Sequence, residues 1–203
     1  MPKIKFIYFD IGGVLIDYKN AFKTATNKFN IPYESFIKVW MKHDDPVTRG
    51  KMTPQEFWNN VRKEFKISKG EEFDFLTSWV EDYKPIKTTH AIIKKFINKY
   101  KIGLISNLYS GMIPMLLAKE LIPDVAYSSI ITSYETGFRK PEREIYELAT
   151  KRVNLNAEEI FFVDDREDFI EGGKSIGWKT FLLNPNDTER SAKKLDRILS
   201  SLK

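Results

Sequence analysis

The stretch that decides the fold runs from residue 4 to residue 15 and reads IKFIYFDIGGVL. Its apolar part, residues 4–9, has the length and aromatic content of a strand buried on both faces of a parallel sheet. Asp10 follows at once, and ligands of such sheets bind just past the carboxyl ends of the strands. The pattern therefore predicts an open α/β fold with Asp10 at its functional edge, where Gly12 and Gly13 allow close approach of the backbone. The alternative is an ordinary Asp that ends a strand and caps a turn.

Two further apolar runs, residues 101–105 and 160–163, end in polar residues in the same way. The residues that follow them are Ser106, Asn107, Asp164 and Asp165. Since the ends of parallel strands meet at one edge of a sheet, we expect these side chains to lie close to Asp10.

Lys140-Pro141 precedes a helix predicted over residues 142–152, with Pro141 at the favoured first helical position. An ammonium group would then join the acids at the sheet edge. Clustered acids raise each other's pKa unless a cation neutralises them. The economical interpretation is a hard metal ion bound by oxygen atoms, with Lys140 balancing the remaining charge.

In this order, the motifs at Asp10, Ser106, Lys140-Pro141 and Asp164-Asp165 resemble the four motifs of the haloacid dehalogenase superfamily. The resemblance extends over residues 3–183. It implies a phosphoryl-transfer enzyme that forms an aspartyl-phosphate and uses Mg²⁺. It also implies an α/β Rossmann-like core, a doubly wound parallel sheet, with a helical cap inserted between the first two motifs.

The resemblance assigns roles to particular residues. The expected catalytic residues are Asp10 as nucleophile, Ser106 as donor to a phosphate oxygen and Lys140 as neutralising cation. The expected phosphate-binding residues are Ile11, Gly12, Ser106, Asn107 and Lys140. The expected metal ligands are Asp10, the Gly12 carbonyl, Asp165 and Asp164, where Asp164 is either a second ligand or the partner of Lys140 and a metal-bound water. For the side chains among them, a purely structural role is the alternative interpretation: Ser106, Asn107, Asp164 and Asp165 could cap helices, and Lys140 could be an exposed lysine before a helix.

Two positions depart from the family pattern. Phosphatases of this family usually carry a general acid-base Asp where this chain has Gly12, and such a loss costs about a hundred- to ten-thousandfold in rate. Asp17 is a weak substitute, and we expect it to be a solvated acid. Many relatives have Asn where this chain has Phe169; the neighbouring Asp168 is expected to be a first-turn acid of a helix.

Strand-helix alternation is interrupted over residues 18–87, where apolar residues recur at helical spacing. One of the predicted helices begins with a capping box at Thr53 and Glu56. We therefore expect an α/β core over residues 1–17 and 88–203, and a cap of packed helices over residues 18–87.

His43, Asp44, Asp45 and Arg49 are expected in a cap loop that could face the active site. For His43, an exposed residue is the favoured interpretation over a substrate contact. Trp40 and Trp58 are expected in the cap core rather than as stacking platforms.

Composition limits the classes of partner. The chain has 203 residues, a net charge of +5, 42% hydrophobic residues and no cysteine. The absence of cysteine excludes disulfides and fits the cytoplasm, and residues 1–5 lead directly into a strand, so no signal peptide is expected. No apolar run has the length of a membrane span, and the lysines are dispersed among acids. The expected partner is a small phosphorylated metabolite, with neither nucleic acid nor membrane; the oligomeric state stays open.

Three functions compete. The first is a magnesium-dependent phosphatase acting on a small, sugar-phosphate-like metabolite. The second is a hydrolytic haloacid dehalogenase, although the Asp164-Asp165 pair would leave uncompensated charge beside its nucleophile. The third is a catalytically weak binding or interaction protein that has lost turnover with Gly12. We rank them in this order.

Overall fold

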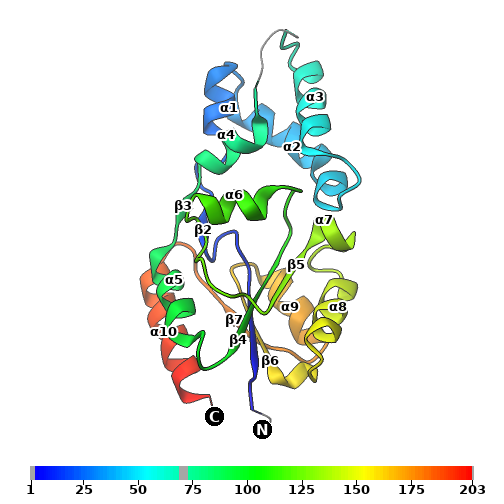
Figure 1. The fold of residues 1–203 in the computed structure, drawn as a ribbon. Coiled ribbons are helices and arrows are strands. Elements are labelled where there is room, and N and C mark those ends of the chain that lie inside the picture. The colour runs from blue at the N-terminus through cyan, green and yellow to red at the C-terminus, as the bar shows by residue number, and fades with distance from the viewer. Residues whose placement is uncertain (1–2, 69–72, 203) are drawn as a thin grey trace.

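A computed structural model describes residues 3–68 and 73–202, in which a five-stranded parallel sheet forms the centre of the molecule (Figure 1). Its strand order is β5-β4-β1-β6-β7. The strands are β1 (Phe6–Phe9), β4 (Lys101–Ser106), β5 (Ser129–Thr132), β6 (Ile160–Asp164) and β7 (Lys179–Leu182). This order, with β1 in the middle, is that of a doubly wound sheet, so the predicted fold class is confirmed.

Helices cover both faces of the sheet. Helices α5 (Lys87–Phe96) and α10 (Thr188–Ser201) pack together on one side, and α8 (Arg143–Val153) and α9 (Glu167–Ser175) on the other (Figure 1). Successive residues of β1 alternate between two hydrophobic clusters, with Ile7 and Phe9 in one and Phe6 and Tyr8 in the other. All of them are buried, which explains the continuous apolar run in the sequence.

The loops on the carboxyl side of the sheet carry shorter elements. Helix α6 (Met112–Ala118) follows β4, and α7 (Ser133–Thr136) follows β5. A single 3₁₀ turn, Ala157–Glu159, leads into β6. Helices α6 and α7 contact the helices inserted between β2 and β3, so they link the sheet to that insertion.

Between two very short strands, the described residues form four helices, which we call the helical insertion. They are α1 (Lys23–Lys28), α2 (Tyr33–Thr48), α3 (Pro54–Glu64) and α4 (Phe75–Glu81). The flanking strands β2 (Ile16–Asp17) and β3 (Lys84–Pro85) pair antiparallel. The insertion lies at the end of the molecule opposite both termini (Figure 1).

Aromatic packing holds the helical insertion together. The Trp58 ring of α3 is buried and stacks on Phe75 of α4 at a centroid distance of 5.4 Å. The predicted capping box is present, because the Thr53 side chain accepts from the Glu56 N–H and Glu56 accepts from the Thr53 N–H. Trp40 is only half-buried and lies against Phe22 and Trp79.

Two local predictions were wrong. Helix α8 begins at Arg143, so Pro141 precedes the helix and does not occupy its first position. Residues 43–45 belong to α2 rather than to a loop, because this helix continues through Pro46. Neither the β2–β3 ribbon nor α7 was predicted.

The expected division at residues 17/18 and 87/88 includes residues 1–2, 69–72 and 203, which lie outside the described part of the chain. Within that part, no helix combines the length and the apolar character needed to cross a bilayer.

Candidate active site

Asp10 lies at the carboxyl edge of the sheet, directly after β1. Its N–H donates to the Val163 carbonyl at 2.9 Å, which continues the ladder between β1 and β6 by one residue. The Asp10 side chain is 6% exposed. The sheet therefore fixes this carboxylate rigidly between the ends of its central strands.

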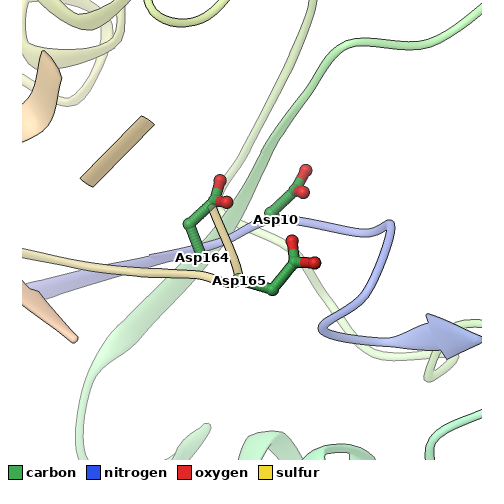
Figure 2. A group of neighbouring side chains, drawn as sticks. All are labelled: Asp10, Asp164 and Asp165. Carbon is green, nitrogen blue, oxygen red and sulfur yellow. The ribbon is translucent and has the colours of Figure 1, made fainter. Parts of the chain in front are cut away.

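Three carboxylates converge at this point. Asp164 ends β6, Asp165 follows it, and one oxygen from each of Asp10, Asp164 and Asp165 lies within 4.8 Å of the others (Figure 2). Asp164 is fully buried, and both its oxygens accept hydrogen bonds, Oδ1 from the Arg166 N–H and Oδ2 from Lys140. The sequence-predicted acids are thus brought together.

Lys140 is the cation of the cluster and is 1% exposed. Its Nζ lies 2.5 Å from Asp164 Oδ2 and 2.9 Å from Asp10 Oδ1. The Phe169 ring covers the ammonium with its centroid at 4.7 Å, a cation–π contact that strengthens as water is excluded. Burial lowers the pKa of Lys140, but the charges of Asp10 and Asp164 outweigh that effect and raise it. Lys140 is therefore charged.

Two acids of the cluster have raised pKa values. Burial, and then repulsion by Asp10, raises the pKa of Asp165 to about 6. Burial also raises the pKa of Asp164, although Lys140 opposes the shift. Among the described residues, Asp10 Oδ1 is buried without a hydrogen-bond donor of suitable geometry.

Three carboxylates and one ammonium leave a net charge of −2 when all are ionised. A net charge of −2 in a buried site and an all-oxygen donor set fit one hard divalent cation. Asp10 and Asp165 are the carboxylates with an oxygen left to bind it, because both Asp164 oxygens already accept hydrogen bonds, from the Arg166 N–H and from Lys140.

The two glycines after Asp10 differ in what they require. Gly13 has φ +71°, and a Cβ on it would lie 2.1 Å from Asp165 Oδ2, so only glycine fits. Gly12 lies outside the left-handed region, and a Cβ there would meet the Tyr18 ring at 3.4 Å, an ordinary contact. Gly13 thus lets the loop approach Asp165 closely.

The remaining predicted residues lie close by. Ser106 ends β4, is 3% exposed and lines the cavity beside Asp10. The Asn107 side chain donates to the Lys140 carbonyl at 3.0 Å and accepts from the Lys140 N–H at 2.9 Å, so it holds the lysine backbone. The Ile11 side chain is in the core, which leaves only its backbone for a ligand.

Sequence reasoning missed three neighbours of the site. Tyr18 lies over Gly12, and burial followed by repulsion from Asp165 raises its pKa to about 12. The Arg166 guanidinium lies 4.1 Å from the centroid of the Phe169 ring and pairs with Asp168. The only one of these neighbours that the sequence pointed to was Phe169, at a position where many relatives have Asn. Asp168 lies in the first turn of α9, as predicted.

Asp17 lies outside the cavity described below, and its carboxylate accepts from the Lys19 N–H at 2.9 Å. His43 packs against Phe57 and does not line that cavity. Their geometry gives neither residue a direct contact with the carboxylate cluster.

A cavity of about 340 Å³ extends from the carboxylate cluster to the helical insertion. Asp10, Gly12, Asp165, Ser106 and Asn107 lie at one end of it. The other end is lined by Ala21 and Phe22 just before α1, by residues of α2, by Trp79 of α4 and by the segment after β4. Its volume is in the range of small-molecule pockets.

Ion pairs connect α2 to the segment before α8, close to this cavity. Arg139 lies 3.0 Å from Asp44 and 3.2 Å from Asp45. Arg49 pairs with Glu142 and also with Asp45. The charged residues that the sequence singled out therefore join the helical insertion to the core, with Asp44 also lining the cavity.

Comparison with known proteins gives one family. The model of the haloacid dehalogenase-like hydrolases matches residues 4–177. Among solved structures, a HAD-like family hydrolase of Porphyromonas gingivalis is 16% identical, with a TM-score of 0.78 over 98% of both chains. A HAD family enzyme of Bacteroides thetaiotaomicron, solved with magnesium and inorganic phosphate, is 22% identical, with a TM-score of 0.73 over 90% of this chain and 95% of that one.

The curated relatives are distant. The D-ribitol-5-phosphate phosphatase of Bacteroides thetaiotaomicron is 24% identical over 88% of this chain and 91% of its own length. The sesquiterpene phosphatase of Aspergillus oryzae is 20% identical over 83% of this chain and 84% of its length. Drimenol cyclase of Aspergillus calidoustus is 21% identical over 91% of this chain, which spans only 35% of the cyclase.

Proposed function

The chain belongs to the haloacid dehalogenase-like hydrolases, and from that premise we propose that it is a magnesium-dependent phosphatase with Asp10 as nucleophile. The observation that carries the proposal is the buried cluster of Asp10, Asp164, Asp165 and Lys140, with its net charge of −2 and its all-oxygen donor set. Such a cluster suits the binding of a divalent cation together with a phosphoryl group.

Asp10, Asp165 and the Gly12 carbonyl are the proposed ligands of Mg²⁺. When bound, the ion would neutralise charge on the phosphoryl group during transfer. The related Bacteroides enzyme crystallised with magnesium and inorganic phosphate supports this choice of ion. In this chain, Gly13 allows the loop to lie close enough to Asp165 for both to reach one ion.

The residues of the chain divide the chemistry among them. One Asp10 oxygen attacks phosphorus in line and forms an acyl phosphate, while the alcohol leaves; water then cleaves the acyl phosphate. Lys140, held by Asp164 and at its backbone by Asn107, neutralises charge on Asp10 and the phosphoryl oxygens. The Ser106 hydroxyl donates to a phosphoryl oxygen.

The helical insertion acts as a cap over this site and selects the alcohol part of the substrate. Support comes from the cavity, because its far end is lined by Phe22 just before α1 and by residues of α2 and α4. The substrate is a small phosphate monoester. Relatives that act on a polyol phosphate and on sesquiterpenes leave two chemical classes for that alcohol, the sugar-like one expected from the sequence and an apolar one.

The proposal is tested with p-nitrophenyl phosphate, assayed with Mg²⁺ and with EDTA. Hydrolysis should require Mg²⁺, and Asp10→Asn should abolish it, because the amide keeps the shape but cannot attack. Asp196→Asn removes a carboxylate of α10 paired with Lys95 and serves as a matched control that retains activity. Full activity of Asp10→Asn would contradict the phosphatase proposal and the dehalogenase alternative together.

A further inference from the structure

The wall of the cavity opposite the carboxylates is aromatic. Phe22, Trp40 and Trp79 of the helical insertion line it, and Phe22 contacts both tryptophans, with ring centroids 5.4 Å from Trp40 and 4.6 Å from Trp79. Tyr83 continues this surface, 6.1 Å from Trp79. Rings in such contact present one continuous apolar surface to a ligand.

Aliphatic residues complete the lining between the aromatic wall and the carboxylates. Ile16, Leu108 and Met112 come from the core, and Ile37 comes from α2. The first three are buried, at 2%, 7% and 1% exposure. A ligand held at Asp10 by its phosphoryl group would therefore place its remaining atoms among hydrocarbon side chains.

Several polar groups beside this wall are already paired with one another. The Trp40 indole N–H donates to Tyr109 Oη at 3.0 Å, and Tyr109 Oη donates to Asp44 Oδ1 at 3.2 Å. Asp44 in turn pairs with Arg139. The Thr48 hydroxyl donates to the Asp44 carbonyl at 2.9 Å. A ligand hydroxyl that approached one of these groups would compete with its present partner.

Among the described residues lining the cavity, two buried side-chain atoms lack a hydrogen-bond partner, Asp10 Oδ1 and Trp79 Nε1. The first belongs to the phosphoryl end. The second offers one donor and no acceptor. A polyol carries several hydroxyls, and each one buried without a partner weakens binding. An alkyl or aryl group has no such requirement.

From this lining we propose that the alcohol part of the substrate is predominantly hydrocarbon, so that this chain acts on phosphate monoesters of apolar alcohols in preference to sugar or polyol phosphates. The inference rests on the proposed phosphatase function for the position of the phosphoryl group. It also replaces the sugar-phosphate-like substrate expected from the sequence with a different chemical class.

A pair of ligands tests the preference directly. Pentyl phosphate and D-ribitol 5-phosphate share a five-carbon chain and a phosphate and differ only in the hydroxyls. Their dissociation constants are measured by calorimetry on Asp10→Asn with Mg²⁺ present, so that neither ester is hydrolysed during the titration. Their inhibition constants are measured on the parent against p-nitrophenyl phosphate hydrolysis. Pentyl phosphate should bind at least about tenfold tighter, and each additional buried methylene, as in hexyl and octyl phosphate, should add up to about fourfold.

Two substitutions in α2 test whether the cavity wall is responsible for this preference. Ile37→Asn places an amide on the cavity wall and should reduce the preference for pentyl over ribitol phosphate about tenfold. Met41→Asn makes the same kind of change one helical turn further along, at a side chain that is 68% exposed and outside the cavity, and should leave the preference unchanged.

The outcomes separate this inference from the proposed function. If p-nitrophenyl phosphate is hydrolysed but ribitol 5-phosphate binds as tightly as pentyl phosphate, the apolar preference is wrong and the phosphatase proposal stands. If no phosphate ester is hydrolysed, the phosphatase proposal fails, while the calorimetric comparison still decides the preference. An equal loss of preference in Met41→Asn would also contradict the assignment to this wall.

Discussion

At the scale of single residues, Gly13 and Asp165 lie so close together that position 13 has no room for a side chain. Both the left-handed backbone and the distance of 2.1 Å that would separate a Cβ at this position from Asp165 Oδ2 require glycine. Gly12 has neither constraint. The adjacent glycines, which look equivalent in the sequence, therefore have different functions in the loop.

Gly13→Ala should displace the Asp165 carboxylate and raise the Mg²⁺ concentration needed for half-maximal activity by at least about tenfold. The measurement is a magnesium titration of p-nitrophenyl phosphate hydrolysis. Gly137→Ala is the matched control, because Gly137 has φ +75° and a Cβ there would have no atom within 4 Å. It imposes the same backbone strain and should leave the titration unchanged; an equal shift would mean that strain, not collision, is responsible.

Gly12→Asp should increase turnover, because the backbone accepts a side chain there and a carboxylate could protonate the leaving group and activate water. The parent should release nitrophenol in a burst and then slowly, since its acyl phosphate lacks a base; the variant should lose the burst and turn over about a hundredfold faster. Rapid-mixing time courses measure both phases.

Gly12→Asn is the control for this substitution, because it has the same size without an ionisable group, and it should retain the burst. A parent enzyme without a burst, and with rapid turnover of alkyl phosphates, would show that another acid-base group already operates. The Tyr18 ring, which contacts the position of the new side chain, is 44% exposed and has room to move.

At the scale of elements, the sequence predicted β1, β4 and β6 well, because nearly all of their residues are buried and form continuous apolar runs. It predicted the meeting of Asp10, Asp164 and Asp165 for the same reason, since strand order brings the ends of β1 and β6 together. The β2–β3 ribbon was missed because strands of two residues leave no periodic pattern.

Helix α2 was interrupted too early in the sequence interpretation. Asp44, Asp45 and Pro46 favour a loop locally, but ion pairs with Arg139 and Arg49 and packing of Val47 keep these residues helical. The pairs with Arg139 join residues about a hundred positions apart, so local propensity cannot reveal them. The aromatic wall of the cavity could not be predicted for the same reason, because its residues are far apart in the sequence.

The ion pair between Asp44 of α2 and Arg139 should contribute to stability. Both side chains are mostly buried, and burial raises the pKa of Asp44 while Arg139 opposes that rise. A double-mutant cycle with Asp44→Asn and Arg139→Gln, measured by urea denaturation, should give a coupling of about 1–2 kcal/mol. The exposed Arg143–Glu147 pair of α8 should give only about 0.3–0.5 kcal/mol in the same experiment. Equal couplings would contradict the stabilising role of the buried pair.

At the scale of the whole molecule, the acidic cluster couples stability to pH and to magnesium. Because the pKa of Asp165 is about 6 in the folded chain against an ordinary value of 3.8, the folded state binds more protons between these values. The contribution of Asp165 to the stability of the metal-free protein therefore falls as pH rises from about 4 to about 6. Above that range the carboxylate is ionised and its repulsion with Asp10 is fully present.

Mg²⁺ should offset that repulsion, so the rise in Tm on adding Mg²⁺ should be small near pH 5 and several degrees larger near pH 7.5. Thermal denaturation in EDTA and in Mg²⁺ measures this difference. Asp165→Asn should remove most of the magnesium effect and flatten the pH dependence of the metal-free protein. A magnesium effect that is independent of pH would contradict the role of Asp165 as a ligand.

The β2–β3 ribbon has a consequence for how such a protein can evolve. The chain leaves the core at Ile16–Asp17 and returns beside it at Lys84–Pro85, with Ile16 paired to Pro85 and Asp17 to Lys84. Because exit and return are neighbours, genetic recombination can replace everything between them without altering the strand order or the carboxylate cluster. The same catalytic core can thereby acquire new substrates through the exchange of one continuous segment of the gene.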